Sequence, residues 1–102
     1  MNSLAALADP TRRRIIELLA QRELAAGEIA NRFTLTAPAI SQHLRALRDA
    51  GLVRVRAEGQ RRIYELDPDG FADLEKWLGQ IRQSWRGRLT TQERRLIKRS
   101  EG

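Results

Sequence analysis

The sequence predicts a small, mainly α-helical domain that carries one β-hairpin, an α+β fold. In the first half of the chain, apolar residues recur every three or four positions, as at Ile40, Leu44 and Leu47, which is the spacing of one helix face. Further along the chain the period changes to two, because Val53 and Val55 alternate with arginines. The chain has 102 residues, of which 41% are hydrophobic and 31% charged, so it is long enough for one modest core.

Two helices are expected at the start of the chain. The first is short and carries Leu4 and Leu7. The second begins at Asp9-Pro10, because Asp is a preferred N-cap and Pro fits the first helical position. It runs to about Arg22, and its buried face is formed by Ile15, Ile16, Leu18 and Leu19.

A helix-turn-helix is expected next. A third, short helix has its apolar face at Ala26, Ile29, Ala30 and Phe33. The three-residue turn Thr34–Thr36 follows, and Thr36 caps a fourth helix over residues 37–50. Pro38 lies in the first turn of this helix, where its missing N–H costs nothing. Two short helices joined by so brief a turn form a helix-turn-helix candidate.

The end of the fourth helix is sharply specified. Gly51 follows the last apolar residue at a position where glycine most easily adopts positive φ, and Leu52 can fold back on Leu47. The polar side of the helix carries Ser41, Gln42, Arg45 and Asp49. A polar helix face ahead of a basic hairpin suits a reader of the DNA major groove, although an ordinary amphipathic helix has the same pattern.

The hairpin is expected over Val53–Leu66, with its turn at Glu58–Gln60. Four arginines give it a basic surface: Arg54, Arg56, Arg61 and Arg62. Asp67–Pro68 ends the hairpin and begins a last, long helix. Residues spaced 3, 4, 3 and 4 apart form an apolar stripe on that helix: Phe71, Leu74, Leu78, Ile81 and Trp85. We expect a first domain of residues 1–88 and a basic tail or short helix over residues 89–102.

The amino-acid composition limits the classes of function that the protein can have. The formal net charge is +6, and 17 of the 19 cationic residues are Arg, which suits bidentate contacts with phosphate and guanine. This composition favours nucleic acid as the binding partner, although it does not exclude an acidic protein or an anionic membrane. The chain has no cysteine, which excludes disulfides, thiolate metal sites and thiol redox sensing. With no signal-peptide segment and no run near 18 apolar residues, we expect a cytoplasmic protein without membrane insertion.

An enzyme fits the sequence poorly. Ser41 and His43 lie on one short helix but face different ways, and no third group would orient them. The chain also lacks a glycine-rich phosphate-binding loop. We therefore expect no catalytic residues and no cofactor.

Three motifs occur in order: ALADPTRRRI over Ala6–Ile15, S-x-H-L-x-x-L-x-x-A-G-L-V over Ser41–Val53, and Gly59 followed by Tyr64-x-Leu66. Together they resemble the ArsR (arsenic-repressor) family of bacterial transcription regulators, over about residues 4–85. The resemblance implies a winged helix-turn-helix, with the helix over 37–50 as recognition helix and the hairpin as wing. It also implies a homodimeric DNA-binding repressor that pairs through its first and last helices.

One departure from the family concerns metals. The metal-sensing members carry a Cys-x-Cys pair at the start of the third helix, whereas Ala25 and Gly27 occupy those positions here and neither can ligate a metal. His43 is the only histidine in the chain. We therefore expect no metal site, and an effector that is a small molecule or another protein.

The candidate DNA-binding residues are Thr36, Ala37, Ala39, Ser41, Gln42, His43, Arg45, Arg61 and Arg62. Gln42 suits adenine and Arg45 suits guanine, whereas the residues before them can touch thymine methyls or a phosphate. His43 borders the buried face and is either a locally bonded side chain or a phosphate contact. Arg61 and Arg62, beside the hairpin turn, either contact phosphate or lie on a solvated strand edge. The candidate dimer contacts are Leu4, Leu7, Phe71, Leu74, Leu78, Ile81 and Trp85.

We thus expect a sequence-specific DNA-binding transcriptional regulator, acting as a dimeric repressor on an inverted-repeat operator. The alternative is a winged-helix module for protein–protein assembly, in which the basic helix meets an acidic partner. Preference for a promoter duplex over random DNA separates the two.

Overall fold

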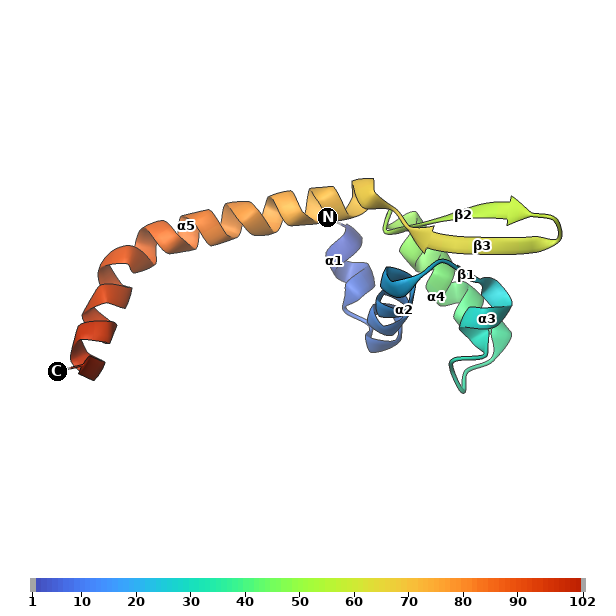
Figure 1. Ribbon diagram of the computed structural model, residues 1–102, viewed down its shortest axis with the longest axis horizontal. Helices are drawn as coiled ribbons and strands as arrows, with labels where there is room; N and C mark the ends of the chain where they lie inside the picture. Colours follow the sequence, from blue (N-terminus) through green and yellow to red (C-terminus); the bar gives the residue numbers. More distant parts are fainter. Residues whose placement is uncertain (1, 102) are drawn as a thin grey trace. The chain divides into compact units, whose positions relative to one another are not determined.

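The computed structural model describes the backbone of residues 2–101 and the side chains of residues 2–88. Its elements are, in order, α1 (Asn2–Leu7), α2 (Pro10–Gln21), β1 (Leu24–Ala25), α3 (Ala26–Ala30), α4 (Ala37–Asp49), β2 (Val53–Glu58), β3 (Arg61–Leu66) and α5 (Pro68–Glu101) (Figure 1). The mainly helical fold with a β-hairpin wing is confirmed. The structure forms two compact units, which divide between Phe71 and Ala72.

The first unit is built around a single apolar core. Its fully buried large side chains are Ile15, Ile29, Ile40, Leu44, Leu47 and Leu52. They come from α2, α3, α4 and the residue before β2, so both helices of the helix-turn-helix are held against α2 and the sheet. The strands form an antiparallel sheet in the order β1-β3-β2.

Both predicted helix N-caps are confirmed. The Asp9 carboxylate accepts hydrogen bonds from the backbone N–H groups of Thr11, at 2.8 Å, and Arg12, at 3.2 Å. The Thr36 hydroxyl accepts one from the N–H of Ala39 at 3.3 Å. The caps satisfy N–H groups that a helix start leaves without partners, and so fix where α2 and α4 begin.

The predicted stop of α4 is also confirmed. Gly51 has a φ of 77°, and its N–H donates to the carbonyl of Arg48 at 2.9 Å. The N–H of Leu52 donates to the carbonyl of Leu47 at 3.0 Å. This pair of bonds is the Schellman motif, which turns the chain directly from α4 into β2.

Gly70 is required by a close approach that the sequence did not indicate. A Cβ atom at this position would collide with the carbonyl group of Gly51. The approach occurs because the N–H of Asp67 donates to the carbonyl of Leu52 at 2.9 Å, which brings the start of α5 back beside the end of α4.

Two local predictions were wrong. The two-residue strand β1 was not expected; it pairs Leu24 with Tyr64 and Ala25 with Ile63. The third helix ends at Ala30 and does not include Phe33, because short turn-like bonds replace the helical pattern. The helix-turn-helix turn is consequently longer than the three residues predicted. The Phe33 side chain still packs against the core.

The last helix, α5, continues from Pro68 to Glu101 without a break at Gly87. The division into a domain of residues 1–88 and a tail of residues 89–102 stays a prediction, since the compact units divide earlier in the chain. In the part of the chain whose side chains are described, no helix is long and apolar enough to cross a membrane.

Candidate nucleic-acid interface

α4 has one buried side and one exposed side, as the spacing of its apolar residues predicts. Ile40, Leu44 and Leu47 are buried, whereas Gln42 and Arg45 are exposed on the other side. Of the other candidate DNA-binding residues at the start of the helix, Thr36, Ala37 and Ser41 are exposed and Ala39 is half-buried. The cap at Thr36 and the stop at Gly51 fix both ends of this polar face.

His43 is half-buried and bonded within the chain. Its Nδ1 accepts a hydrogen bond from Nε of Arg12 at 3.2 Å, which links α4 to α2. Because Nδ1 is the acceptor, the neutral ring carries its proton on Nε2. Of the two roles considered for His43, the geometry supplies the local bond. The neighbouring Asp9 carboxylate has a lowered pKa, chiefly because it accepts the backbone N–H of Arg12.

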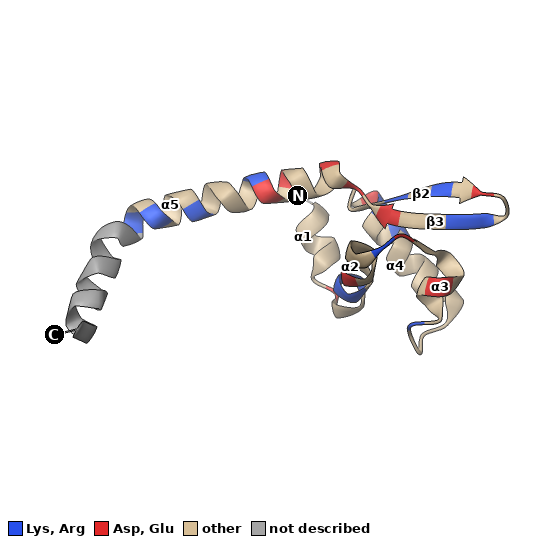
Figure 2. Cartoon of the chain, in the orientation of Figure 1, with Lys and Arg blue, Asp and Glu red and all other residues tan. Residues whose placement is uncertain are grey.

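Most of the wing's positive charge is paired with carboxylates. Arg56 donates two hydrogen bonds of 2.8 Å to Glu23, and Arg54 donates one of 2.9 Å to Glu65. Figure 2 shows these charges of both signs along the hairpin. The bond from Arg56 lowers the pKa of Glu23. The paired side of the wing is therefore close to electrically neutral.

The two arginines beside the hairpin turn differ. Arg61 donates to Oε1 of Glu28 at 2.9 Å. Arg62 is exposed and has no ion pair or side-chain hydrogen bond among the described residues. Arg62 thus has its full charge available to an approaching anion, whereas Arg61 shares its charge with a carboxylate.

Glu28 joins three parts of the first unit. Its carboxylate accepts hydrogen bonds from the backbone N–H of Ala25 at 3.0 Å, from Arg22 at 3.1 Å and from Arg61 at 2.9 Å. The N–H of Ala25 is the main cause of its lowered pKa, and the two arginines lower it further. Glu28 was not among the functional residues predicted from the sequence. Its position three residues after Ala25, at the start of a helix, was the available signal.

The two positions that the resemblance singled out, at the N-cap and in the first turn of α3, carry no side chain that can ligate a metal. Ala25 is buried, and Gly27 is exposed without a side chain. Among the side chains of residues 2–88, no group of three His, Cys, Asp or Glu lies close enough together to hold a metal ion.

Comparison with known proteins identifies the family. Residues 9–55 match the family described as bacterial regulatory protein, arsR family. The Bacillus subtilis transcriptional repressor SdpR is 36% identical over 77 residues, which cover 76% of this chain and 86% of SdpR. The chain belongs to the ArsR family. The resemblance stated from the three motifs is thereby confirmed.

Other transcriptional regulators are similar to this chain over different shares of their length. The regulator Rv2034 of Mycobacterium tuberculosis is 54% identical over 69 residues, which cover 68% of this chain but 64% of Rv2034. An ArsR-like transcriptional regulator from Rhodococcus sp. RHA1 superposes with a TM-score of 0.76 at 30% identity, over 88% of this chain and 85% of that one. The homodimeric winged helix-turn-helix DNA-binding domain of Mb0332 from Mycobacterium bovis superposes with a TM-score of 0.66 at 33% identity, over 80% and 76% of the two chains.

Proposed function

We propose that this protein is a cytoplasmic, DNA-binding transcriptional repressor that acts as a homodimer on an inverted-repeat operator. The observation that carries the proposal is the polar face of α4. Gln42 and Arg45 are exposed on it, and neither forms a side-chain hydrogen bond or ion pair among the described residues. The opposite side of α4 packs against the core. A helix that is fixed in this way and has free hydrogen-bond donors and acceptors on its exposed side is suited to binding in the major groove.

The chemistry of each side chain supports a different role for it. The Gln42 amide can pair with the edge of adenine, and the Arg45 guanidinium can donate two bonds to guanine. Ala37, Ala39 and Ser41, at the start of α4, are small enough to approach thymine methyls or a phosphate. Thr36 lies where phosphates favour a helix N-terminus.

The wing contributes phosphate contacts through its tip. Arg62 is the stronger candidate, since no described carboxylate neutralises it. Arg61 contacts phosphate only by sharing or leaving Glu28, because the two side chains are already paired. Because Arg61 would exchange one anion for another, its phosphate contact should contribute less binding free energy than a contact from an unpaired arginine.

Homodimerisation is supported by apolar side chains that a single chain leaves exposed. Their exposed fractions are 42% for Leu4, 46% for Leu78, 51% for Ile81 and 58% for Trp85. Apolar surface of this kind marks an interaction site, and a second copy is the partner that two-fold operator recognition requires. Leu7 and Phe71 are half-buried. Leu74 is already buried in the single chain, so a second copy would cover little more of it.

A fluorescent duplex taken from the protein's own promoter tests the proposal against a winged-helix module for protein assembly. A repressor should bind this duplex more tightly than a scrambled duplex by at least about a thousandfold. Its affinity should also weaken steeply as salt is added. Equal affinity for both duplexes would contradict the repressor and favour the assembly module.

A further inference from the structure

Positive charge without a carboxylate partner lies on the first unit away from the wing. Arg54, Arg56 and Arg61 are each paired with glutamate. In contrast, Arg14 of α2 and Arg32 of the helix-turn-helix turn are exposed and have no ion pair or side-chain hydrogen bond among the described residues. Net charge, rather than the count of arginines, determines how strongly a surface attracts a phosphate backbone.

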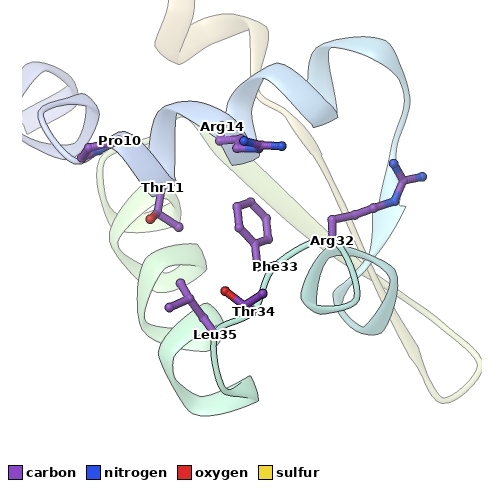
Figure 3. A pocket seen from close by; sticks show the side chains of 7 residues that line it. All are labelled: Pro10, Thr11, Arg14, Arg32, Phe33, Thr34 and Leu35. Atoms are coloured by element: carbon purple, nitrogen blue, oxygen red, sulfur yellow. The ribbon is translucent and has the colours of Figure 1, made fainter.

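These two arginines line one groove. Its volume is about 460 Å³, and it lies between the start of α2 and the helix-turn-helix turn. Pro10, Thr11 and Arg14 form one wall, and the segment Arg32–Leu35 forms the other. Figure 3 shows the Phe33 ring between Arg14 and Thr34. No carboxylate lines the groove, so its lining carries a formal charge of +2 from Arg14 and Arg32.

The groove lies next to the N-terminus of α4, the proposed recognition helix. It ends at Leu35, directly before the Thr36 cap of α4, and the bond from Arg12 to His43 holds α2 against α4. It shares no residue with the hairpin. When a helix lies in the major groove, the preceding helix and turn pass close to the sugar–phosphate backbone.

We propose that this groove is a second binding site for the phosphate backbone of duplex DNA, with Arg14 and Arg32 as its anion ligands. The inference rests on the proposed function and adds a contact that the wing does not supply. Guanidinium groups bind phosphate oxygens with paired N–H donors, and the hydroxyls of Thr11 and Thr34 add neutral donors from the same walls. Phe33 and Leu35 complete the lining of the groove with apolar side chains.

The test is the salt dependence of DNA binding by Arg14→Gln and Arg32→Gln. Each phosphate contact contributes about −0.9 to the slope of log affinity against log salt concentration. Each variant removes one contact per protomer, so a dimer should lose about 1.8 from the magnitude of its slope. Both variants should weaken the promoter duplex and a scrambled duplex alike, because phosphate contacts carry no sequence information.

Arg54→Gln is the matched control, since it removes the same charge from an arginine that is paired with Glu65. It should keep the wild-type slope. Arg14→Lys and Arg32→Lys should retain most of the slope, because the charge remains. Circular dichroism checks that each variant is folded, and both positions are exposed.

Two different outcomes separate the groove from the proposed function. If wild-type protein prefers its promoter duplex but Arg14→Gln and Arg32→Gln keep the wild-type slope, the groove is not a phosphate site. If the two variants lower the slope but wild-type protein binds both duplexes equally, the groove is supported and the sequence-specific repressor is contradicted. Equal losses in the variants and in Arg54→Gln would also overturn the inference, since general charge would then explain the effect.

Discussion

Glu28 of α3 and Arg61 of β3 are 33 positions apart in the chain, and their side chains form an ion pair of 2.9 Å. The same carboxylate accepts the N–H of Ala25 at the start of α3. The hairpin tip is thus connected to the first helix of the helix-turn-helix. Because the Arg61 side chain is exposed and Glu28 is only half-buried, the pair adds little to stability, but it determines where the charge of Arg61 lies in the free protein.

This ion pair predicts different effects for the two arginines at the hairpin tip. Arg62→Gln should lower the magnitude of the salt slope of DNA binding, whereas Arg61→Gln should leave it nearly unchanged. Glu28→Gln should release Arg61 and raise the magnitude of the slope, and adding Arg61→Gln to that variant should reverse the gain. Fluorescence anisotropy across a salt series measures all four proteins. Equal losses for Arg61→Gln and Arg62→Gln would show that Glu28 does not restrain Arg61.

The lowered pKa values of Glu23 and Glu28 predict an acid-sensitive fold. Arg56 is the main cause for Glu23, and the N–H of Ala25 is the main cause for Glu28. A carboxylate with a lowered folded-state pKa stabilises the fold above its unfolded pKa, and that contribution is lost as the pH falls through the folded pKa. The contribution of these two carboxylates to the free energy of unfolding should therefore be fully present above the ordinary pKa of 4.5 and be lost as the pH falls below it.

Urea unfolding at a series of pH values measures this decrease. Glu28→Gln should show a shallower decrease than wild type, because it cannot gain a proton at that position. Glu17→Gln is the control, since Glu17 is exposed on α2 and has no ion pair among the described residues. A decrease of the same steepness in Glu28→Gln and wild type would contradict the role given to the carboxylate.

The close approach at Gly70 predicts opposite effects of alanine at two positions of α5. Gly79→Ala should stabilise the helix by about 0.5–1 kcal/mol, because alanine loses less backbone entropy and nothing lies within 4 Å of the added Cβ. Gly70→Ala should be destabilising in spite of the same gain in helix propensity, because its Cβ meets the carbonyl of Gly51. Thermal unfolding compares the two, and a stabilised Gly70→Ala would show that the two segments do not approach so closely.

The exposed apolar stripe of α5 predicts a dimer that a single substitution by glutamate should dissociate. Wild-type protein should be dimeric by light scattering, and Leu78→Glu or Ile81→Glu should be monomeric, because each places a carboxylate in an apolar contact. Gln80→Glu is the control, since Gln80 is exposed on the other side of the same helix. A wild-type protein that stays monomeric at high micromolar concentration would contradict the dimer.

Local sequence patterns predicted the parts of the fold that depend on neighbours along the chain. The buried side of α4 follows from the spacing of Ile40, Leu44 and Leu47, and its ends follow from Thr36 and Gly51, because caps and stops use backbone groups within a few residues. The exposure of the base-reading candidates follows from the same period.

Contacts between distant segments were not predictable in this way. The strand β1 has only two residues, so it has no alternation to detect, and it exists because Tyr64 and Ile63 of β3 pair with it. The bonds from Arg56 to Glu23 and from Arg61 to Glu28 each join residues 33 positions apart. The sequence predicted a basic surface from the four arginines of the hairpin, whereas Arg54, Arg56 and Arg61 are each paired with a glutamate.

The most direct test of the central claim is the base preference of Arg45→Ala, measured by competition with duplexes that carry every single-base change in the operator. If α4 reads the major groove, this variant should lose about 1–3 kcal/mol of binding free energy per half-site and lose preference at one position in each half-site, with the rest of the preference profile unchanged. The half-site centres should lie about 34–36 Å apart, or a multiple of that, as two-fold symmetry requires. If Arg45→Ala instead weakened every duplex equally and kept the full profile, α4 would not be the recognition helix.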